Sequence, residues 1–463
     1  MLTRRKFLVT TGTLATATIL GRSVLDPEPV YAATFVRKDI GGLTASDPII
    51  KSYRKAIKAM QALPTTNPLS WAYQAAIHGT TLSGSHTAWN TCEHGTVYFW
   101  SWHRMYLYWF ERIIRHMAGD PGWALPYWNW SSASERQLPA MFRDTTSELY
   151  TSNRNTNMNN GSGSLPASDV DYSAAFAYTD FASADSVIQG VPHGQVHVDV
   201  GGWMGQVPQA AQDPIFYLHH CNIDRLWNLW LAQGGGRNDP VNDATWKAKT
   251  YTFFNEKGKA VKMNDCQVLR AAQQLNYTYE GEPPQVTPDC LKLVFPWWLY
   301  VVLEQIPIPV PPILLGPGPV EIPFDIPGLP RLQDLAGNDS QRILLQLDDV
   351  EADKQPGASW EVYVGLPSNA PATTDSPFYV GNVVLFGMGI REEAHHDFKG
   401  AHFQFAINKA LLEAKKANSK MTLRFVPHGI LIDGKPSTPE VLSPVKVNKV
   451  SIAVTTQKEQ KKQ

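Results

Sequence analysis

The histidines of this chain are concentrated in one region, because nine of the 13 lie between positions 78 and 220 of its 463 residues. His193 and His197 are four residues apart, about one helical turn, so both rings point the same way on a helix. This spacing is typical of a pair of metal ligands. His219 and His220 are adjacent, and adjacent helical side chains diverge by about 100°, so only one of them can reach the same metal ion.

A second group of histidines lies earlier in the chain. His78 ends an apolar predicted helix, His94 follows Cys92 by two positions, and His103 lies in a strongly aromatic segment. The two groups together offer six imidazoles without a carboxylate at matching spacing, which favours copper, zinc or iron over magnesium or calcium. Taken singly, each of these histidines can equally be a core residue satisfied by a hydrogen bond.

Apolar periodicity separates a helical half from a β-rich half. It predicts helices over residues 47–63, 71–78, 97–117 and 213–233. Residues 151–170 are polar and predict a surface loop. Prolines crowd residues 283–341, which predicts a linker with neither helix nor central strand. Alternating apolar runs at 360–364, 383–386 and 423–426 predict a β-rich domain over residues 342–455, with a disordered tail over 456–463.

The N-terminal segment has the pattern of a targeting signal. Arg4 and Arg5 precede an apolar run over residues 9–20 that is too short to span a bilayer, and a small-residue cleavage site follows at 30–32. The pattern resembles a twin-arginine export signal. We therefore expect a signal peptide over 1–32, export to the periplasm or the cell exterior, and no integral membrane segment in the mature protein. A membrane anchor and a chance arginine pair are the alternatives.

Three stretches resemble the two copper-binding segments of the tyrosinase, catechol oxidase and molluscan haemocyanin family. They are residues 92–104, 192–197 and 213–227, within a match that covers about residues 36–280. The match ends at Tyr277 and Tyr279, similar to an aromatic pair that packs on an early arginine, here Arg37. The resemblance implies a mainly α catalytic domain over 33–282, a four-helix bundle that houses two copper ions. It implies these ligands: His78, His94 and His103 for the first copper, and His193, His197 and His220 for the second.

The resemblance also assigns roles around the second copper. The family uses the second histidine of its adjacent pair, so His219 becomes a support residue. Asp224, one turn after His220, is expected to hold the His220 ring by a hydrogen bond. Phe216, one turn before His220, is expected to pack against the site, although an ordinary core role is an equal alternative.

Cys92 stands in a Cys-X-His pattern. It resembles family members in which the cysteine sulfur is covalently bonded to the second histidine of the first copper site, here His94. A thiol, or a disulfide with Cys221, Cys266 or Cys290, is the alternative.

The resemblance implies oxidation of ortho-diphenols to ortho-quinones, with a small phenolic substrate and O2 as partners. Members that hydroxylate monophenols tend to have a glutamate four residues before the first ligand of the second site and an asparagine just after that ligand. Here these positions are Gln189 and Gly194, and an amide cannot act as a base, so we expect weak or absent monophenol hydroxylation. The family's gate position is Val207 rather than phenylalanine. This smaller side chain leaves access to the site open, which favours monophenol hydroxylation.

Several alternatives remain at this point. They are a tyrosinase with full monophenolase activity, an ortho-aminophenol oxidase, a haemocyanin-like O2 carrier and a zinc hydrolase. Lys and Arg number 41 against 42 Asp and Glu, so no basic stripe for nucleic acid is expected.

Residues 342–455 resemble the β-rich shield of latent plant-type polyphenol oxidases, which implies that they cover the copper site until a protease acts. A stabilising or sugar-binding appendage is the alternative, and a copper chaperone is a further partner left open.

Overall fold

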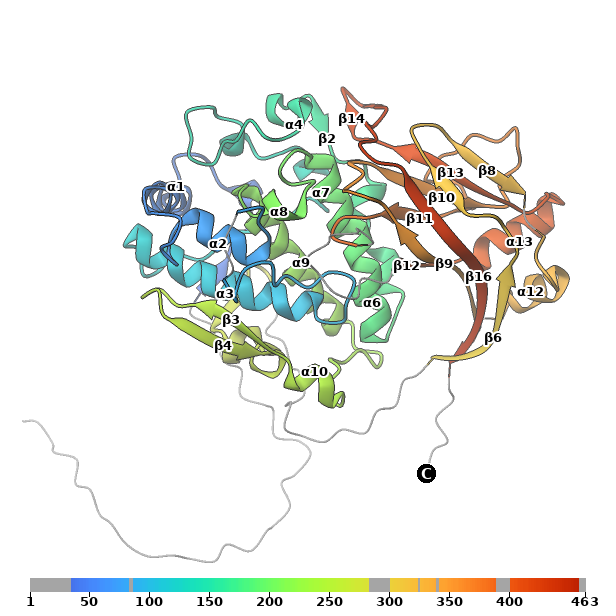
Figure 1. Cartoon of the computed structure of the whole chain (residues 1–463), viewed down its shortest axis with the longest axis horizontal. Coiled ribbons are helices and arrows are strands. Elements are labelled where there is room, and N and C mark those ends of the chain that lie inside the picture. The colour runs from blue at the N-terminus through green and yellow to red at the C-terminus, as the bar shows by residue number, and fades with distance from the viewer. Residues whose placement is uncertain are drawn as a thin grey trace, which may run out of the picture.

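The computed structural model describes residues 35–82, 86–282, 300–323, 325–338, 341–388 and 400–457. The predicted signal peptide, Cys290 and most of the predicted tail lie outside the described residues. The described elements form a helical part and a β-rich part, each around a hydrophobic core (Figure 1). The fold class is therefore the predicted one, a mainly α domain followed by a β-rich domain.

The four predicted helices are present, and their ends differ from the prediction by at most two residues. They are α1 (Pro48–Gln61), α2 (Trp71–His78), α3 (Phe99–Ala118) and α9 (Ile215–Ala232). Asp47 and Ser70 cap α1 and α2, because their side chains accept hydrogen bonds from backbone N–H groups of the first turn. Gly119, in the left-handed conformation with φ 65°, ends α3.

His193 and His197 lie on two consecutive helical segments, η5 (Gln189–Gly194) and α7 (Gln195–Val200). The helical path is interrupted at Val191, which has φ −124° and ψ 124°. Both histidines follow this interruption, so they still lie one turn apart on a common face.

The remaining elements of the helical part are short. The helices are α4 (Thr156–Asn160), α5 (Ser173–Phe176), α6 (Phe181–Ile188), α8 (Val207–Ala210), α10 (Ala244–Ala248) and α11 (Ala271–Gln274). The 3-10 turns are η1 (Ile40–Gly42), η2 (Ala133–Glu135), η3 (Ala140–Phe142), η4 (Ser168–Val170) and η6 (Asp265–Gln267). The strands are β1 (Phe35–Arg37), β2 (Gly163–Ser164), β3 (Thr250–Phe254), β4 (Ala260–Asn264) and β5 (Tyr277–Tyr279). Among the described residues, no helix is both long enough and apolar enough to cross a bilayer.

The two ends of the helical domain are joined by Arg37. β1 pairs in parallel with β5, and the Arg37 guanidinium carbon lies 3.6 Å from the centroid of the Tyr277 ring. Arg37 Nη1 also donates to the Tyr279 hydroxyl at 2.9 Å. The packing expected of this aromatic pair on the early arginine is therefore present.

The predicted surface loop over residues 151–170 is only partly a loop. It contains α4, β2 and η4, and β2 pairs with β14 (Leu431–Ile432) of the β-rich part. The polar composition gives no sign of β2, because this two-residue strand depends on a partner strand far away in the sequence.

The strands of the β-rich part are β6 (Tyr300–Ile308), β7 (Ile313–Leu315), β8 (Val320–Pro323), β9 (Gln341–Glu351), β10 (Ser359–Val364), β11 (Tyr379–Val384), β12 (Ala401–Ala406), β13 (Thr422–His428), β14 (Leu431–Ile432), β15 (Lys435–Pro436) and β16 (Val445–Gln457). One sheet has the strand order β11-β10-β13-β8 and another β12-β9-β16-β6, with β7 also paired to β16. β14 and β15 form a smaller sheet with β2 of the helical part. Helices α12 (Leu329–Leu335) and α13 (Asn408–Ala417) complete the β-rich part.

The predicted proline-rich linker is wrong for the residues from position 300 onward. β6, β7, β8 and α12 all belong to the β-rich domain, which therefore begins well before residue 342. The prolines are tolerated because β6 and β8 stand at the ends of their sheets, where one side of the strand needs no hydrogen-bonded neighbour. β16 likewise extends through the first two residues of the predicted tail, to Gln457.

Candidate metal centre

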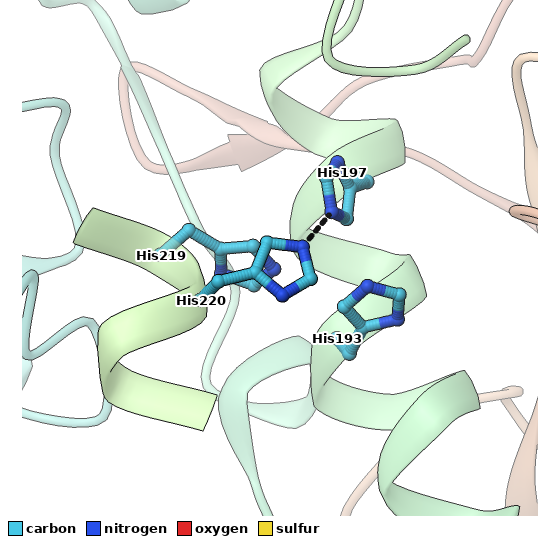
Figure 2. Close-up of side chains that lie close together, drawn as sticks. All are labelled: His193, His197, His219 and His220. Atoms are coloured by element: carbon cyan, nitrogen blue, oxygen red, sulfur yellow. Dashed lines mark hydrogen bonds between the residues drawn. The ribbon is translucent and has the colours of Figure 1, made fainter. Parts of the chain in front are cut away.

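The six predicted ligands are brought together by separate segments of the helical domain. His78 is the last residue of α2, His94 lies in the loop before α3, and His103 lies in α3. His220 lies in α9, opposite the pair on η5 and α7 (Figure 2). All six side chains are buried.

The six rings form two adjacent groups of similar size. In the first group, the ring centroids of His78, His94 and His103 are 5.3, 5.3 and 5.7 Å apart. In the second group, the centroids of His193, His197 and His220 are 4.7, 4.9 and 5.3 Å apart. The groups meet where His103 stacks on His220, with 4.3 Å between centroids.

Backbone carbonyls orient four of the rings through Nδ1. The pairs are His78 with Val207 at 3.2 Å, His103 with Phe99 at 2.8 Å, His193 with Gln189 at 3.0 Å and His197 with Met204 at 2.9 Å. A carbonyl only accepts hydrogen bonds, so Nδ1 of each ring carries the proton. The lone pair of each neutral ring is therefore on Nε2, the arrangement found in histidine metal ligands.

The Nε2 atoms of this centre lack ordinary partners. Those of His78, His94, His103 and His193 are buried without a hydrogen bond to any described residue. Leaving such an atom unsatisfied costs about 1–3 kcal/mol, unless a metal ion takes its lone pair. The Nε2 atoms of His197 and His220 face each other at 3.2 Å. Imidazole-only donor sets suit copper, so these residues fit that metal.

Burial keeps the rings neutral. It lowers the pKa of all six histidines well below the ordinary value, and that of His94 to about 3. Neighbouring imidazoles lower the pKa of five of them further, His94 being the exception. Neutral rings keep the lone pairs that bind a metal ion.

His219 lies beside the second group but differs from its members in its hydrogen bonding. Its donor atom falls within 4.8 Å of those of His193, His197 and His220. Trp130 Nε1 donates to His219 Nδ1 at 3.1 Å, and an indole N–H can only donate. The proton of neutral His219 is therefore on Nε2, which leaves this ring no free lone pair for a metal ion.

The predicted contact between Asp224 and His220 is wrong. The Asp224 carboxylate instead accepts hydrogen bonds from Arg104, Arg37, Tyr277 and Tyr279. Burial alone would raise the pKa of Asp224, but Arg104 and then Arg37 outweigh it and hold the pKa below its ordinary value. His220 Nδ1 has no hydrogen-bond partner among the described residues.

Cys92 lies against the ring of His94, with 3.4 Å between Cys92 Sγ and His94 Nδ1. Cys266 is disulfide-bonded, and Cys221 is buried in the helical core, where burial raises the pKa of its thiol. The sulfur of Cys92 is therefore next to the imidazole that the Cys-X-His pattern indicates.

The remaining predicted site residues surround the centre. The Phe216 ring lies 4.2 Å from that of His220 and 4.7 Å from that of His78, so it packs between the two groups. Val207 contacts the centre through its carbonyl. Gly194 is tightly packed, because a Cβ there would lie 3.0 Å from the Gln189 carbonyl oxygen and 3.1 Å from Val384 of the β-rich domain. Gln189 is buried behind His193.

Phe386 is a site residue that the sequence analysis missed. It follows β11, and its ring stacks on that of His197 with 3.8 Å between centroids and 8° between planes. Its centroid also lies 5.5 Å from that of His193 and 5.6 Å from that of His94. We expected a strand over 383–386, but β11 ends at Val384 and the chain then turns into the centre. The local pattern carries no signal for a contact between residues 189 positions apart.

Six converging imidazoles in a helical bundle define a class: a dinuclear, histidine-liganded metalloprotein. Comparison with known proteins narrows the class. A family model described as the common central domain of tyrosinase matches residues 68–184 and 152–233. A second model, a domain of unknown function (DUF7868), matches residues 330–454.

Relatives resemble the chain over most of its length. Tyrosinase HcTyr1 of Hahella sp. (strain CCB-MM4) is 31% identical over 421 residues, which cover 78% of this chain and 88% of that protein. The latent form of chloroplastic polyphenol oxidase from Prunus armeniaca is 27% identical over 392 residues, 74% of this chain and 65% of that protein. The structure of latent apple tyrosinase has the same fold, with a TM-score of 0.64 and 24% identity over 94% of this chain and 100% of that one.

The chain belongs to the tyrosinase and polyphenol oxidase family. It is a copper-dependent oxidoreductase that acts on phenols with O2, and its cofactor is a pair of copper ions.

Proposed function

We propose that this protein oxidises ortho-diphenols to ortho-quinones and hydroxylates monophenols weakly or not at all. Each diphenol loses two electrons and two protons, and O2 takes four of each to form two waters, so two diphenols are consumed per O2. Copper supplies the electron transfer between the phenol and O2. The protein holds the metals, orients the substrate and keeps water away.

The ligands that we propose are His78, His94 and His103 for the first copper, and His193, His197 and His220 for the second. The two ring groups, the carbonyl-bound Nδ1 atoms and the unpartnered Nε2 atoms support this assignment. Phe99 and Phe216 pack directly on these rings and form an apolar surround that excludes water.

One observation carries the preference for diphenols. In the described part of the chain, no carboxylate hydrogen-bonds to any of the six rings. The amide of Gln189 stands where related monophenolases tend to have a glutamate, and its hydrogen bonds are committed elsewhere. A diphenol, which is more acidic and already carries both oxygens, depends less on such a base.

The rival is a tyrosinase with full monophenolase activity, which the small side chain of Val207 at the gate position favours. Oxygen uptake on catechol, tyrosine and ortho-aminophenol, combined with copper content per chain, separates these cases. We expect copper-dependent uptake with catechol at least about tenfold faster than with tyrosine, which corresponds to about 1.4 kcal/mol of activation free energy. Equal rates would rule out the preference, and uptake only on ortho-aminophenol would reassign the substrate.

We also propose a thioether between Cys92 and His94. Joining the sulfur to a ring carbon removes two hydrogen atoms, and O2, which the activity consumes, accepts them as hydrogen peroxide. The 3.4 Å approach of Cys92 Sγ to the ring supports this bond. The peptide that contains both residues should be lighter by two hydrogen atoms after copper loading, and a peptide of unchanged mass would exclude the bond.

The β-rich domain is proposed to shield the copper centre, with Phe386 as the residue that covers the second site. Its stacking on His197 supports this role. Cleavage between the two domains by a protease is then expected to raise activity.

We further propose that residues 1–32 direct export through a twin-arginine pathway, which carries folded, metal-loaded proteins. A copper chaperone would act before that step.

A further inference from the structure

Gln189 contacts the segments that carry two different metal-binding histidines. Its backbone carbonyl accepts the hydrogen bond from His193 Nδ1 at 3.0 Å. Its side chain reaches the loop after His94, where Oε1 accepts from Gly95 N at 2.6 Å and Nε2 donates to the Thr96 carbonyl at 3.1 Å. One buried residue therefore joins the two halves of the centre.

Asp185 fixes the direction of this amide. Gln189 Nε2 donates its second proton to Asp185 Oδ2 at 2.7 Å. Asp185 Oδ1 accepts from Trp100 N, at the start of α3, at 3.3 Å. Both protons and the oxygen of the Gln189 amide are thus committed, and both residues are buried.

His94 depends on its loop for its position. Among the six histidines it is the one outside a helix, and its Nδ1 faces Cys92 instead of a carbonyl. Its ring nevertheless stacks near that of His193, with 5.6 Å between centroids and 27° between planes. The hydrogen bonds of Gln189 to Gly95 and Thr96 hold this loop against the His193 segment.

We propose that Gln189 and Asp185 are positioning residues that hold His94 of the first copper site at a fixed separation from His193 of the second. This inference rests on the proposed function, because the ligand roles of His94 and His193 are assigned there. The pair would act on the metals through these two histidines, because its hydrogen bonds go to the segments that carry them.

The pair predicts a specific rescue. Gln189→Glu replaces the donating amide by an acceptor that faces the Thr96 carbonyl and the Asp185 carboxylate. Asp185→Asn places an NH2 group against either the Gln189 amide or the Trp100 N–H. In the double variant the new asparagine accepts from Trp100 and donates to the new glutamate, which still accepts from Gly95, so only the link to Thr96 is lost.

The first test uses copper-free protein and hydrogen exchange of the Gly95 amide. We expect Gln189→Leu to lower its protection by about tenfold, in line with loss of one hydrogen bond of about 1–1.5 kcal/mol. Gln346→Leu is the matched control, because Gln346 is a buried glutamine of the β-rich domain whose oxygen accepts from Gln305 and Ser451 there. Unchanged protection in the Gln189→Leu protein would overturn the proposal.

The second test measures copper release to a chelator from the loaded full-length chain. Gln189→Glu and Asp185→Asn should each release copper about 10–100-fold faster than the wild type, the usual effect of losing an outer hydrogen bond to a metal site. The double variant should recover at least about tenfold of that loss. A double variant no better than either single variant contradicts the positioning role. If the wild type itself bound no copper, the proposed function would fail. Hydrogen exchange of the Gly95 amide would then decide by itself whether Gln189 joins the His94 loop to the His193 segment.

Discussion

The ring of Phe386 lies parallel to the ring of His197, with 3.8 Å between their centroids. The two residues belong to different domains, and Gly387, with φ +70°, lets the chain pass so close that a Cβ there would lie 2.6 Å from the His94 ring. A substrate ring that stacked on His197 from this side would occupy the space of the Phe386 ring. This overlap supports the proposed shielding of the centre by the β-rich domain.

Replacing Phe386 by alanine should raise the activity of the full-length chain. Burial of a phenylalanine side chain is worth roughly 1.5–3 kcal/mol, so its loss should favour the open state by about tenfold to a hundredfold. Catechol turnover by uncleaved protein, with copper content measured in parallel, reports the change. The matched control is Phe403→Ala, a buried residue of β12 without contact to the histidines, for which turnover should stay at the wild-type level. Equal increases in turnover for both variants would show that loosening of the β-rich domain controls access to the copper centre, and that the Phe386 ring on His197 does not.

Asp224→Asn should destabilise the helical domain. Arg37 and Arg104 are both buried on the Asp224 carboxylate. Removal of its charge leaves Arg104 without its ion-pair partner, whereas Arg37 keeps its ion pair with Glu111. Breaking a buried ion pair in this way costs about 3–5 kcal/mol. The urea midpoint of the copper-free protein measures the loss.

Asp239 provides the control for Asp224. Burial raises the pKa of Asp239 to about 7, so this carboxyl is partly protonated near neutral pH and an amide resembles its neutral form. Its oxygen accepts from Trp227, as an amide oxygen also can. Asp239→Asn should therefore shift the midpoint little. A similarly small shift for Asp224→Asn would mean that water or another group compensates the arginines.

The parts of this protein that depend on short-range pattern could be predicted from the sequence. Helices α2 and α9 follow from apolar periodicity, and the pair of His193 and His197 follows from a spacing of one turn. Six imidazoles without carboxylates favour copper, zinc or iron through donor chemistry alone, and the resemblance to the family selects copper. These inferences need no knowledge of how distant segments meet.

The parts that failed depend on distant segments. Asp224 was expected to face His220 because both lie on α9, but the two buried arginines, from β1 and α3, attract its carboxylate. The proline-rich strands β6 and β8 were missed because their edge positions are a property of the assembled sheets. Phe386 was missed because docking of one domain on another leaves no periodic signal.

The ligand assignment predicts different outcomes for three histidine variants. His103→Ala and His197→Ala each remove one imidazole from a site, so copper content should fall and oxygen uptake on catechol should be lost. His116 lies on α3 but is exposed and outside both groups, so His116→Ala should retain copper and uptake. Full copper content in the His197→Ala protein would show that His219 or a solvent ligand substitutes, and the proposed ligand set would then need revision.

A buried charged cluster joins the two domains beside the copper centre. His428 of β13 contacts Asp169 of η4 through Nε2 at 2.7 Å and Glu361 of β10 through Nδ1 at 2.8 Å. Burial alone would lower the pKa of His428, but Asp169 and then Glu361 outweigh it and raise the pKa to about 11. Asp199 of α7 adds a further favourable interaction, and burial raises its own pKa.

This cluster predicts that alkaline pH weakens the contact between the domains. A raised pKa stabilises the docked state fully below the ordinary histidine pKa of about 6.5, and the stabilisation is lost as pH rises toward about 11. Each pH unit in that window should weaken docking by up to about tenfold if separation exposes His428 to water.

Hydrogen exchange over residues 379–388, corrected for the intrinsic pH dependence of exchange, measures this weakening. Protection should fall between pH about 7 and about 10, and His428→Gln should remove that pH dependence. His402→Gln is the control, because His402 pairs with Asp348 within the β-rich domain, and it should retain the wild-type profile. Protection that stays constant across this range in the wild type would mean that His428 does not hold the domains together.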